Sequence, residues 1–191
     1  HDSELVVDLP QHPAYADILD VTCIAESRFT IASASGPEAI ARVLNKPMVM
    51  VNGYSQPDHW LNAGDQLLFK TYRDKNSGRL IGYDEMLGRD LFLLNTVEGF
   101  EKAGVVLEDN SPEEILGAII EMEARLDGSF EPDAALDARF ISLSESHLAR
   151  YRANLPERGP KEQDRFETYP YALPWTRYCQ SFMRANPWFL S

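Results

Sequence analysis

Short apolar runs alternate with helix-like apolar stripes over the first 95 residues of the chain. Between the runs, apolar residues recur at the spacing of one helix face. Met48–Val51 is continuous and apolar, which is typical of a strand covered on both faces in a parallel sheet. The pattern predicts strands at residues 5–7, 28–34, 48–51 and 66–70, and helices at 15–25 and 37–44. We therefore expect an α/β fold built on a Rossmann-like parallel sheet of about four strands.

The remaining chain has a more helical pattern. Ser111 is predicted to cap a helix that has Pro112 in its first turn and Glu114 in a capping box, and Gly128 is predicted to end it. Further helices are predicted at 98–103, 138–154 and 175–185, with an extended piece at 104–107 and a loop at 155–171. We divide the chain into a Rossmann-like domain, residues 1–126, and a helical, loop-rich and aromatic tail, residues 127–191, that packs on it.

Composition and charge exclude several function classes. The 191 residues are 44% hydrophobic and 25% charged, which is ordinary for a globular protein. The net charge of -12 argues against a nucleic-acid binder, which needs a surplus of Lys and Arg, and against adsorption to anionic lipid. Residues 98–137 hold twelve acidic and two basic side chains, which we interpret as a solvated helix surface. No apolar run approaches the length of a membrane helix.

The two cysteines do not indicate a metal site. Cys23 and Cys179 lie far apart and have no metal-ligand spacing with the four histidines, so we expect two buried, reduced thiols.

The strand–loop–helix at residues 28–44 is the best candidate for chemistry. Ser35 and Gly36 lie between a predicted strand and the first turn of a predicted helix, where free amides and a partial positive charge suit phosphate. Gly36 lets a phosphate approach the backbone, and Ser33 and Ser35 offer hydroxyl groups. The other interpretation is a Ser-Gly-Pro turn that only caps a helix, and Glu38 in the first turn opposes an anion.

This part of the chain resembles a known enzyme family. Residues 26–52 read ESRFTIASASGPEAIARVLNKPMVMVN, with a strand, a small-residue loop containing Ser-Gly-Pro, a helix, a Lys-Pro turn and an apolar strand. This block resembles the carboxyl-terminal half of GT-B glycosyltransferases, and is most similar to bacterial glycosyltransferases of surface-polysaccharide loci. The likeness covers about residues 5–90, and it extends to the related sugar-nucleotide 2-epimerases.

The resemblance implies a nucleotide-sugar donor as substrate, with no metal and no separate cofactor. Ser35 and Gly36 would face the diphosphate, Glu38 would lie near the ribose, and Asn52 would lie beside the base or sugar. Lys70 and Arg73 would neutralise diphosphate charge as the glycosidic bond breaks. The other interpretation of both residues is an exposed surface position. The residues expected to bind substrate are Ser33, Ser35, Gly36, Pro37, Glu38, Asn52, Lys70 and Arg73.

Glycosyl transfer also needs an acid or base and an acceptor. In GT-B proteins the base comes from the amino-terminal half, so the resemblance implies a missing half or partner domain, and Leu5–Val7 would be an internal strand of an incomplete sheet. Within this chain the candidates are His12, His59 and Glu85. We expect a glycan acceptor and a cytoplasmic location, either free or peripheral at the inner membrane.

Two other functions remain open. A sugar-nucleotide epimerase would need more carboxylates and histidines in the cleft. A non-catalytic module would bind sugar or protein through the aromatic tail, although such clusters more often pack against their own domain. The tail aromatics are Tyr169, Tyr171, Trp175, Tyr178, Phe182, Trp188 and Phe189.

Overall fold

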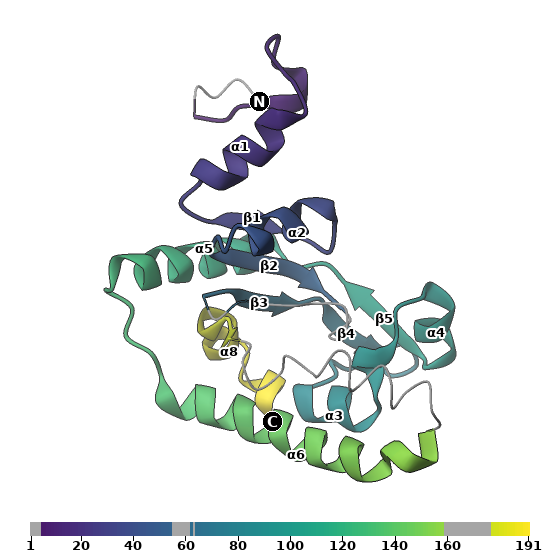
Figure 1. Cartoon of the computed structure of the whole chain (residues 1–191). Coiled ribbons are helices and arrows are strands. Elements are labelled where there is room, and N and C mark those ends of the chain that lie inside the picture. The colour runs from purple at the N-terminus through teal and green to yellow at the C-terminus, as the bar shows by residue number, and fades with distance from the viewer. Residues whose placement is uncertain (1–4, 55–61, 63, 159–176) are drawn as a thin grey trace.

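The computed structural model describes residues 5–54, 62, 64–158 and 177–191 (Figure 1). The first half contains η1 (Leu9–Gln11), α1 (Ile18–Glu26), β1 (Thr30–Ala32), α2 (Gly36–Val43), β2 (Met48–Gly53), β3 (Gln66–Phe69), β4 (Thr71–Asp74), α3 (Tyr83–Gly88) and η2 (Leu91–Leu93). The second half contains α4 (Val97–Lys102), β5 (Val105–Glu108), α5 (Pro112–Asp127), α6 (Ala134–Arg158), β6 (Arg177–Tyr178), α8 (Gln180–Ala185) and η4 (Pro187–Leu190).

A parallel sheet of four strands, in the order β1-β2-β3-β6, forms the centre of the molecule. The fold is therefore α/β with a parallel sheet, as the alternation of strands and helices predicted. In β2, Met48, Val49 and Met50 are fully buried, which confirms the strand predicted from the continuous apolar run. Thr30 pairs with Met48 and Met50 pairs with Leu67, so β1, β2 and β3 lie side by side.

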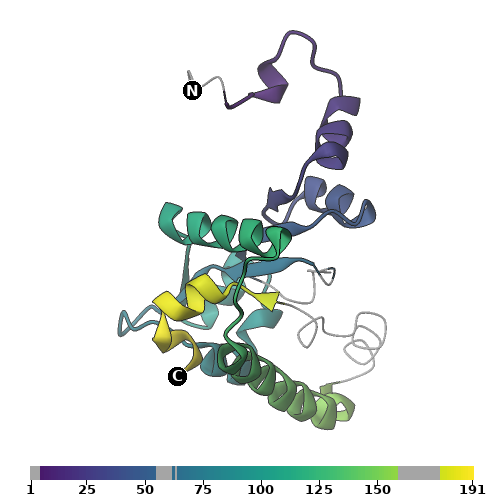
Figure 2. The ribbon, with the colours of Figure 1, turned by 90° about the vertical axis from the view of Figure 1, so that its left-hand side faces the viewer.

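The first predicted strand is wrong. Leu5, Val6 and Val7 form no strand, and their exposed fractions are 95%, 57% and 66%. A β-strand needs a neighbouring strand for its backbone hydrogen bonds, and no described strand pairs with this segment. Instead it belongs to an amino-terminal arm, residues 5–17, which precedes α1. This arm lies away from the sheet in both views of the ribbon (Figures 1 and 2).

The fourth strand of the sheet comes from the other end of the chain. β6 pairs in parallel with β3 through Leu67 and Tyr178, at the start of a segment predicted as one helix, residues 175–185. α8 follows β6 and packs on α5, which contacts β2 and β3. The predicted domain boundary falls at the end of α5 and stays a prediction, but residues on both sides of it share one hydrophobic core.

The two-stranded antiparallel sheet of β4 and β5 continues from the end of β3. β5 agrees with the extended piece predicted at residues 104–107, whereas β4 was not predicted. α6 extends beyond the predicted helix, residues 138–154, at both ends. At its carboxyl end it includes the first residues of the predicted loop at 155–171. The rest of that loop lies outside the described residues. α6 contacts β6, and Figure 1 shows α6 at the opposite end of the molecule from α1.

An aromatic cluster joins the tail to the sheet. The rings of Tyr178 and Phe189 stack with centroids 4.6 Å apart, and Phe182 meets Phe189 edge-on at 5.3 Å. Tyr83 of α3 stacks on Phe140 of α6 at 4.6 Å. These rings are all buried, so the described tail aromatics other than the half-buried Trp188 belong to the core. Within the described residues, no helix is both long enough and apolar enough to cross a membrane.

Truncation of Phe189 tests whether the tail is part of this core. Phe189 is 4% exposed, and we expect Phe189→Ala to lower the free energy of unfolding by about 3–5 kcal/mol, because it leaves a cavity among packed rings. Urea unfolding measures the change. Val43→Ala on α2 is the control, since Val43 is 85% exposed and should cost within about 0.5 kcal/mol. Equal, small losses for both variants would contradict the described packing.

Candidate functional site

The carboxyl ends of three parallel strands meet at one edge of the sheet. The loop Ser33–Gly36 follows β1, Tyr54 follows β2, and Lys70 follows β3. In open parallel sheets this edge is where ligands bind. The structure therefore brings the predicted loop, the end of β2 and Lys70 to the same side of the sheet.

The start of α2 lies exposed at this edge. Ser33, Ser35, Gly36 and Pro37 are all solvent-exposed. Ser35 is the N-cap, but its hydroxyl donates to the Ser33 carbonyl at 3.1 Å and does not cap the helix. A Cβ added to Gly36 would meet no atom within 4 Å. No side chain caps the start of α2. Pro37 has no amide hydrogen and the Glu38 amide donates to the Ser35 carbonyl at 3.3 Å, so the Ser35 and Gly36 amides are the donors at this helix start. The space beside Gly36 is open.

Glu38, in the first turn of α2, is buried with an exposed fraction of 6%. One carboxyl oxygen, Oε1, accepts a hydrogen bond from Arg42 at 2.5 Å, and the other, Oε2, is buried without a hydrogen-bond partner. Burial raises the pKa of Glu38, while the Arg42 guanidinium acts in the opposite direction. The predicted contact of Glu38 with a ribose would need access to this buried carboxyl group.

Asn52 is held by a reciprocal pair of hydrogen bonds with Asn110. The Asn52 amide donates to the Asn110 side-chain oxygen at 2.7 Å, and the Asn110 amide donates to the Asn52 side-chain oxygen at 2.7 Å. The Asn110 side-chain amide also donates to the Phe69 carbonyl at 2.6 Å. Asn52 has a φ of 55°, a left-handed conformation that Asn tolerates better than most residues. Its side-chain oxygen therefore links the end of β2 to the start of α5.

The two predicted cations are paired within the chain. Lys70 forms an ion pair with Asp109, and Arg73 donates to both carboxylate oxygens of Glu108 at 2.7 and 2.8 Å. Glu108 consequently has a lowered pKa, chiefly through its hydrogen bond from Arg73. Both acids belong to the acidic segment 98–137, which we had interpreted only as a solvated surface. The sequence showed that cations and acids of opposite charge were present, but it did not show which of them would pair.

The catalytic candidates have different surroundings. Glu85 accepts hydrogen bonds from Arg79 at 2.7 Å and Arg89 at 3.0 Å, and the Arg79 bond is the main cause of its lowered pKa. A general base is most effective with a pKa near the working pH, so this environment does not favour Glu85 as a base. His12 is exposed on the amino-terminal arm, where its Nδ1 accepts from the Ala14 amide at 3.2 Å. His59 lies outside the described residues.

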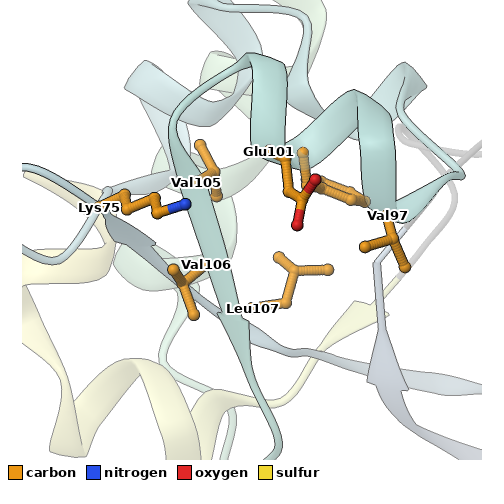
Figure 3. A pocket seen from close by; sticks show the side chains of 7 residues that line it. Lys75, Val97, Glu101, Val105, Val106 and Leu107 are labelled. Atoms are coloured by element: carbon orange, nitrogen blue, oxygen red, sulfur yellow. The ribbon is translucent and has the colours of Figure 1, made fainter.

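One hollow of the structure was not predicted from the sequence. It has a volume of about 300 Å³ and lies between α4 and β5 (Figure 3). Figure 3 shows the Glu101 carboxylate pointing in among the apolar side chains of this hollow, and the Lys75 ammonium at its margin. The lining residues are Lys75, Val97, Phe100, Glu101, Val105, Val106 and Leu107. Among the described residues, no group of three or more His, Cys, Asp and Glu side chains is arranged to hold a metal ion.

Comparisons with known proteins identify no relative: no protein-family model, no curated protein and no solved structure matches this chain.

The two serine N-caps should differ in their effect on stability. The Ser111 hydroxyl accepts from the Glu114 amide at 3.2 Å, so Ser111→Ala should lower the free energy of unfolding by about 1 kcal/mol. The Ser35 hydroxyl makes no such bond, so Ser35→Ala should change it by within about 0.5 kcal/mol. Urea unfolding of both variants at one pH measures the difference. A loss for Ser35→Ala as large as that for Ser111→Ala would show that Ser35 caps α2 in solution.

The buried carboxyl group of Glu38 should affect stability as a function of pH. Its pKa is raised in the folded state, so the folded chain binds more protons than the unfolded chain between the unfolded pKa and the folded pKa. The Glu38 contribution to the free energy of unfolding therefore falls as pH rises through this interval. Glu38→Gln lacks that fall, and its stability relative to the unmodified chain should increase as pH rises from the ordinary glutamate pKa of about 4.3 through the raised pKa of Glu38. Denaturant unfolding across this range measures the difference, and a decrease would contradict the burial of an ionisable Glu38.

Proposed function

We propose that this chain is the donor-binding part of a glycosyltransferase, which moves a sugar from a nucleotide-diphosphate donor to a glycan acceptor. The observation that carries the proposal is the exposed start of α2 at the carboxyl edge of the parallel sheet, without a side-chain cap. A diphosphate there would accept hydrogen bonds from the Ser35 and Gly36 amides and would be favoured by the helix dipole.

The order of elements around this loop supports the proposal. β1, the Ser33–Gly36 loop, α2, the Lys46–Pro47 turn and β2 follow one another as in the GT-B pattern that the sequence resembles. The open space above Gly36 suits the close approach of a phosphate. In this proposal the sheet is a Rossmann-like sheet of a GT-B carboxyl-terminal domain.

Lys70 would change partners when the donor binds. Its ion pair with Asp109 is formed at the surface, where the Asp109 side chain is 70% exposed, so exchanging that carboxylate for a phosphate costs little. Arg73 has a further bond to the Gly78 carbonyl at 2.7 Å besides its two bonds to Glu108. We therefore assign the charge-neutralising role to Lys70 before Arg73.

The catalytic base is proposed to come from a partner domain that also binds the acceptor. Glu85 is engaged by two arginines, and His12 belongs to the arm that lies away from the sheet. We assign neither residue a catalytic role. The alternative of a sugar-binding module gains no support from the described tail, because Tyr178, Phe182 and Phe189 are buried and offer no surface for stacking.

A thermal-shift experiment with nucleotide diphosphates tests the proposal. The chain is tested with UDP, GDP, ADP and CDP at millimolar concentration, and we expect at least one of them to raise the melting temperature. A ligand at 100 times its Kd stabilises the folded state by about 2.7 kcal/mol. Gly36→Asp should abolish the shift, since its carboxylate repels the diphosphate. The same carboxylate in the first helical turn is favourable to the helix, so the variant should fold.

Gly88→Asp is the matched control. Gly88 is also exposed, and an added Cβ there meets nothing within 4 Å. This variant should keep the shift. No shift of the unmodified chain with any nucleotide diphosphate, or a shift that persists in Gly36→Asp, would overturn the proposed donor site.

A further inference from the structure

Two helices of this chain begin with the same capping signature but use it differently. Ser35–Glu38 and Ser111–Glu114 both read Ser-x-x-Glu, the pattern of a capping box. In α5 the box is closed: the Ser111 hydroxyl accepts from the Glu114 amide at 3.2 Å, and the Ser111 amide donates to the Glu114 carboxylate at 2.8 Å. In α2 neither side chain forms its half of the box.

The residue four positions after the glutamate differs between the two helices. Glu38 has Arg42 at this position, and the two form an ion pair at 2.5 Å with side chains only 8% and 18% exposed. Glu114 has Ala118, which has no charge, and its carboxylate turns back to the helix start. Residues four apart lie on the same helix face, so Arg42 can compete with the Ser35 amide for the Glu38 carboxylate.

Arg42 is itself anchored to the sheet. The Asp65 carboxylate accepts from the Met48 amide at 2.9 Å and from the Asn62 amide at 2.7 Å, and it interacts electrostatically with the Arg42 guanidinium. The Asn62 side chain donates to the Arg42 carbonyl at 3.2 Å. Arg42 is therefore attracted by two acids, Glu38 on its own helix and Asp65 just before β3.

We propose that Arg42 is a positioning residue that keeps the start of α2 open to a diphosphate by holding Glu38 away from the Ser35 amide. The inference rests on the proposed donor site. Without Arg42, Glu38 turns back and closes the box, as Glu114 does in α5. Its buried oxygen, which has no hydrogen-bond partner here, would then gain one. The closed box removes an amide from the site and places a negative charge where the diphosphate binds.

Inorganic pyrophosphate is the probe, because it tests the helix start without requiring recognition of a base or sugar. Its affinity is measured by calorimetry at constant ionic strength for the unmodified chain, Arg42→Met, and the double variant Arg42→Met with Glu38→Ala. Met keeps the apolar stem that packs in the partly buried position of Arg42. Ala is used at position 38 because Gln also closes a capping box.

We expect Arg42→Met to weaken pyrophosphate binding about tenfold, and the double variant to restore the affinity to within about threefold of the unmodified chain. Restoration distinguishes positioning from a direct attraction between Arg42 and the ligand, which the double variant would still lack. Hydrogen exchange supplies a second measurement: the Ser35 amide should become more protected in Arg42→Met, whereas a general loosening of α2 would make it less protected.

The outcomes separate this inference from the proposed function. If the unmodified chain does not bind pyrophosphate, the anion site itself is wrong. If it binds and Arg42→Met binds equally well, or if the double variant remains weak, only the role of Arg42 is overturned. If Arg42→Met does not fold, the Asp65→Asn variant loosens Arg42 through its anchor and should weaken binding unless Glu38 is also replaced by Ala.

Discussion

The burial of β2 and β3 on both faces is the constraint on which the rest of this structure depends. Val49, Met50 and Leu68 are fully buried, so helices must cover both faces of the sheet and other strands must pair with the outer edges of these two. The chain meets this need from distant segments, because β1 flanks one side and the two-residue strand β6 flanks the other. The Tyr178 hydroxyl accepts a hydrogen bond from the Phe69 amide at 3.1 Å, which ties β6 to the end of β3.

The same sheet creates the proposed site. Because the strands are parallel, their carboxyl ends share one edge, and the loop before α2 lies there with the residues that follow β2 and β3. The reciprocal bonds between Asn52 and Asn110 then fix this edge against the start of α5. In the proposed site, the exposed start of α2 would offer the Ser35 and Gly36 amides to an anionic ligand without rearrangement of the backbone.

Ion pairs join the acidic segment, residues 98–137, to residues that precede it in the chain. Asp109 pairs with Lys70, Glu108 with Arg73 and Asp127 with Arg28. Each exposed pair contributes little to stability by itself. Glu121 has a different role because it is only 3% exposed. Its carboxylate accepts from Gln66 of β3, Arg125 of α5 and the Ser181 amide of α8.

Features that depend on near neighbours could be predicted from the sequence. The continuous apolar run of β2, the capping box of α5 and the end of that helix at Gly128 depend on residues a few positions apart, and all three were predicted correctly. The position of Ser35 and Gly36 between β1 and α2 was also readable, because a strand run, a small-residue loop and a helix stripe follow one another there.

Tertiary structure alone decided which segments met. Leu5–Val7 has a strand-like composition, but a strand exists only where a neighbouring strand accepts its hydrogen bonds, and β6 is too short to leave a pattern. The partners of Lys70 and Glu85 were likewise beyond sequence reasoning, since attraction between charges does not say which of them will be adjacent. In the two Ser-x-x-Glu signatures the local sequence permitted a capping box in both helices, and in α2 it also permitted an ion pair between Glu38 and Arg42, four residues apart. Only the structure showed that α5 closes its box, whereas in α2 Glu38 pairs with Arg42 and its carboxyl group is buried.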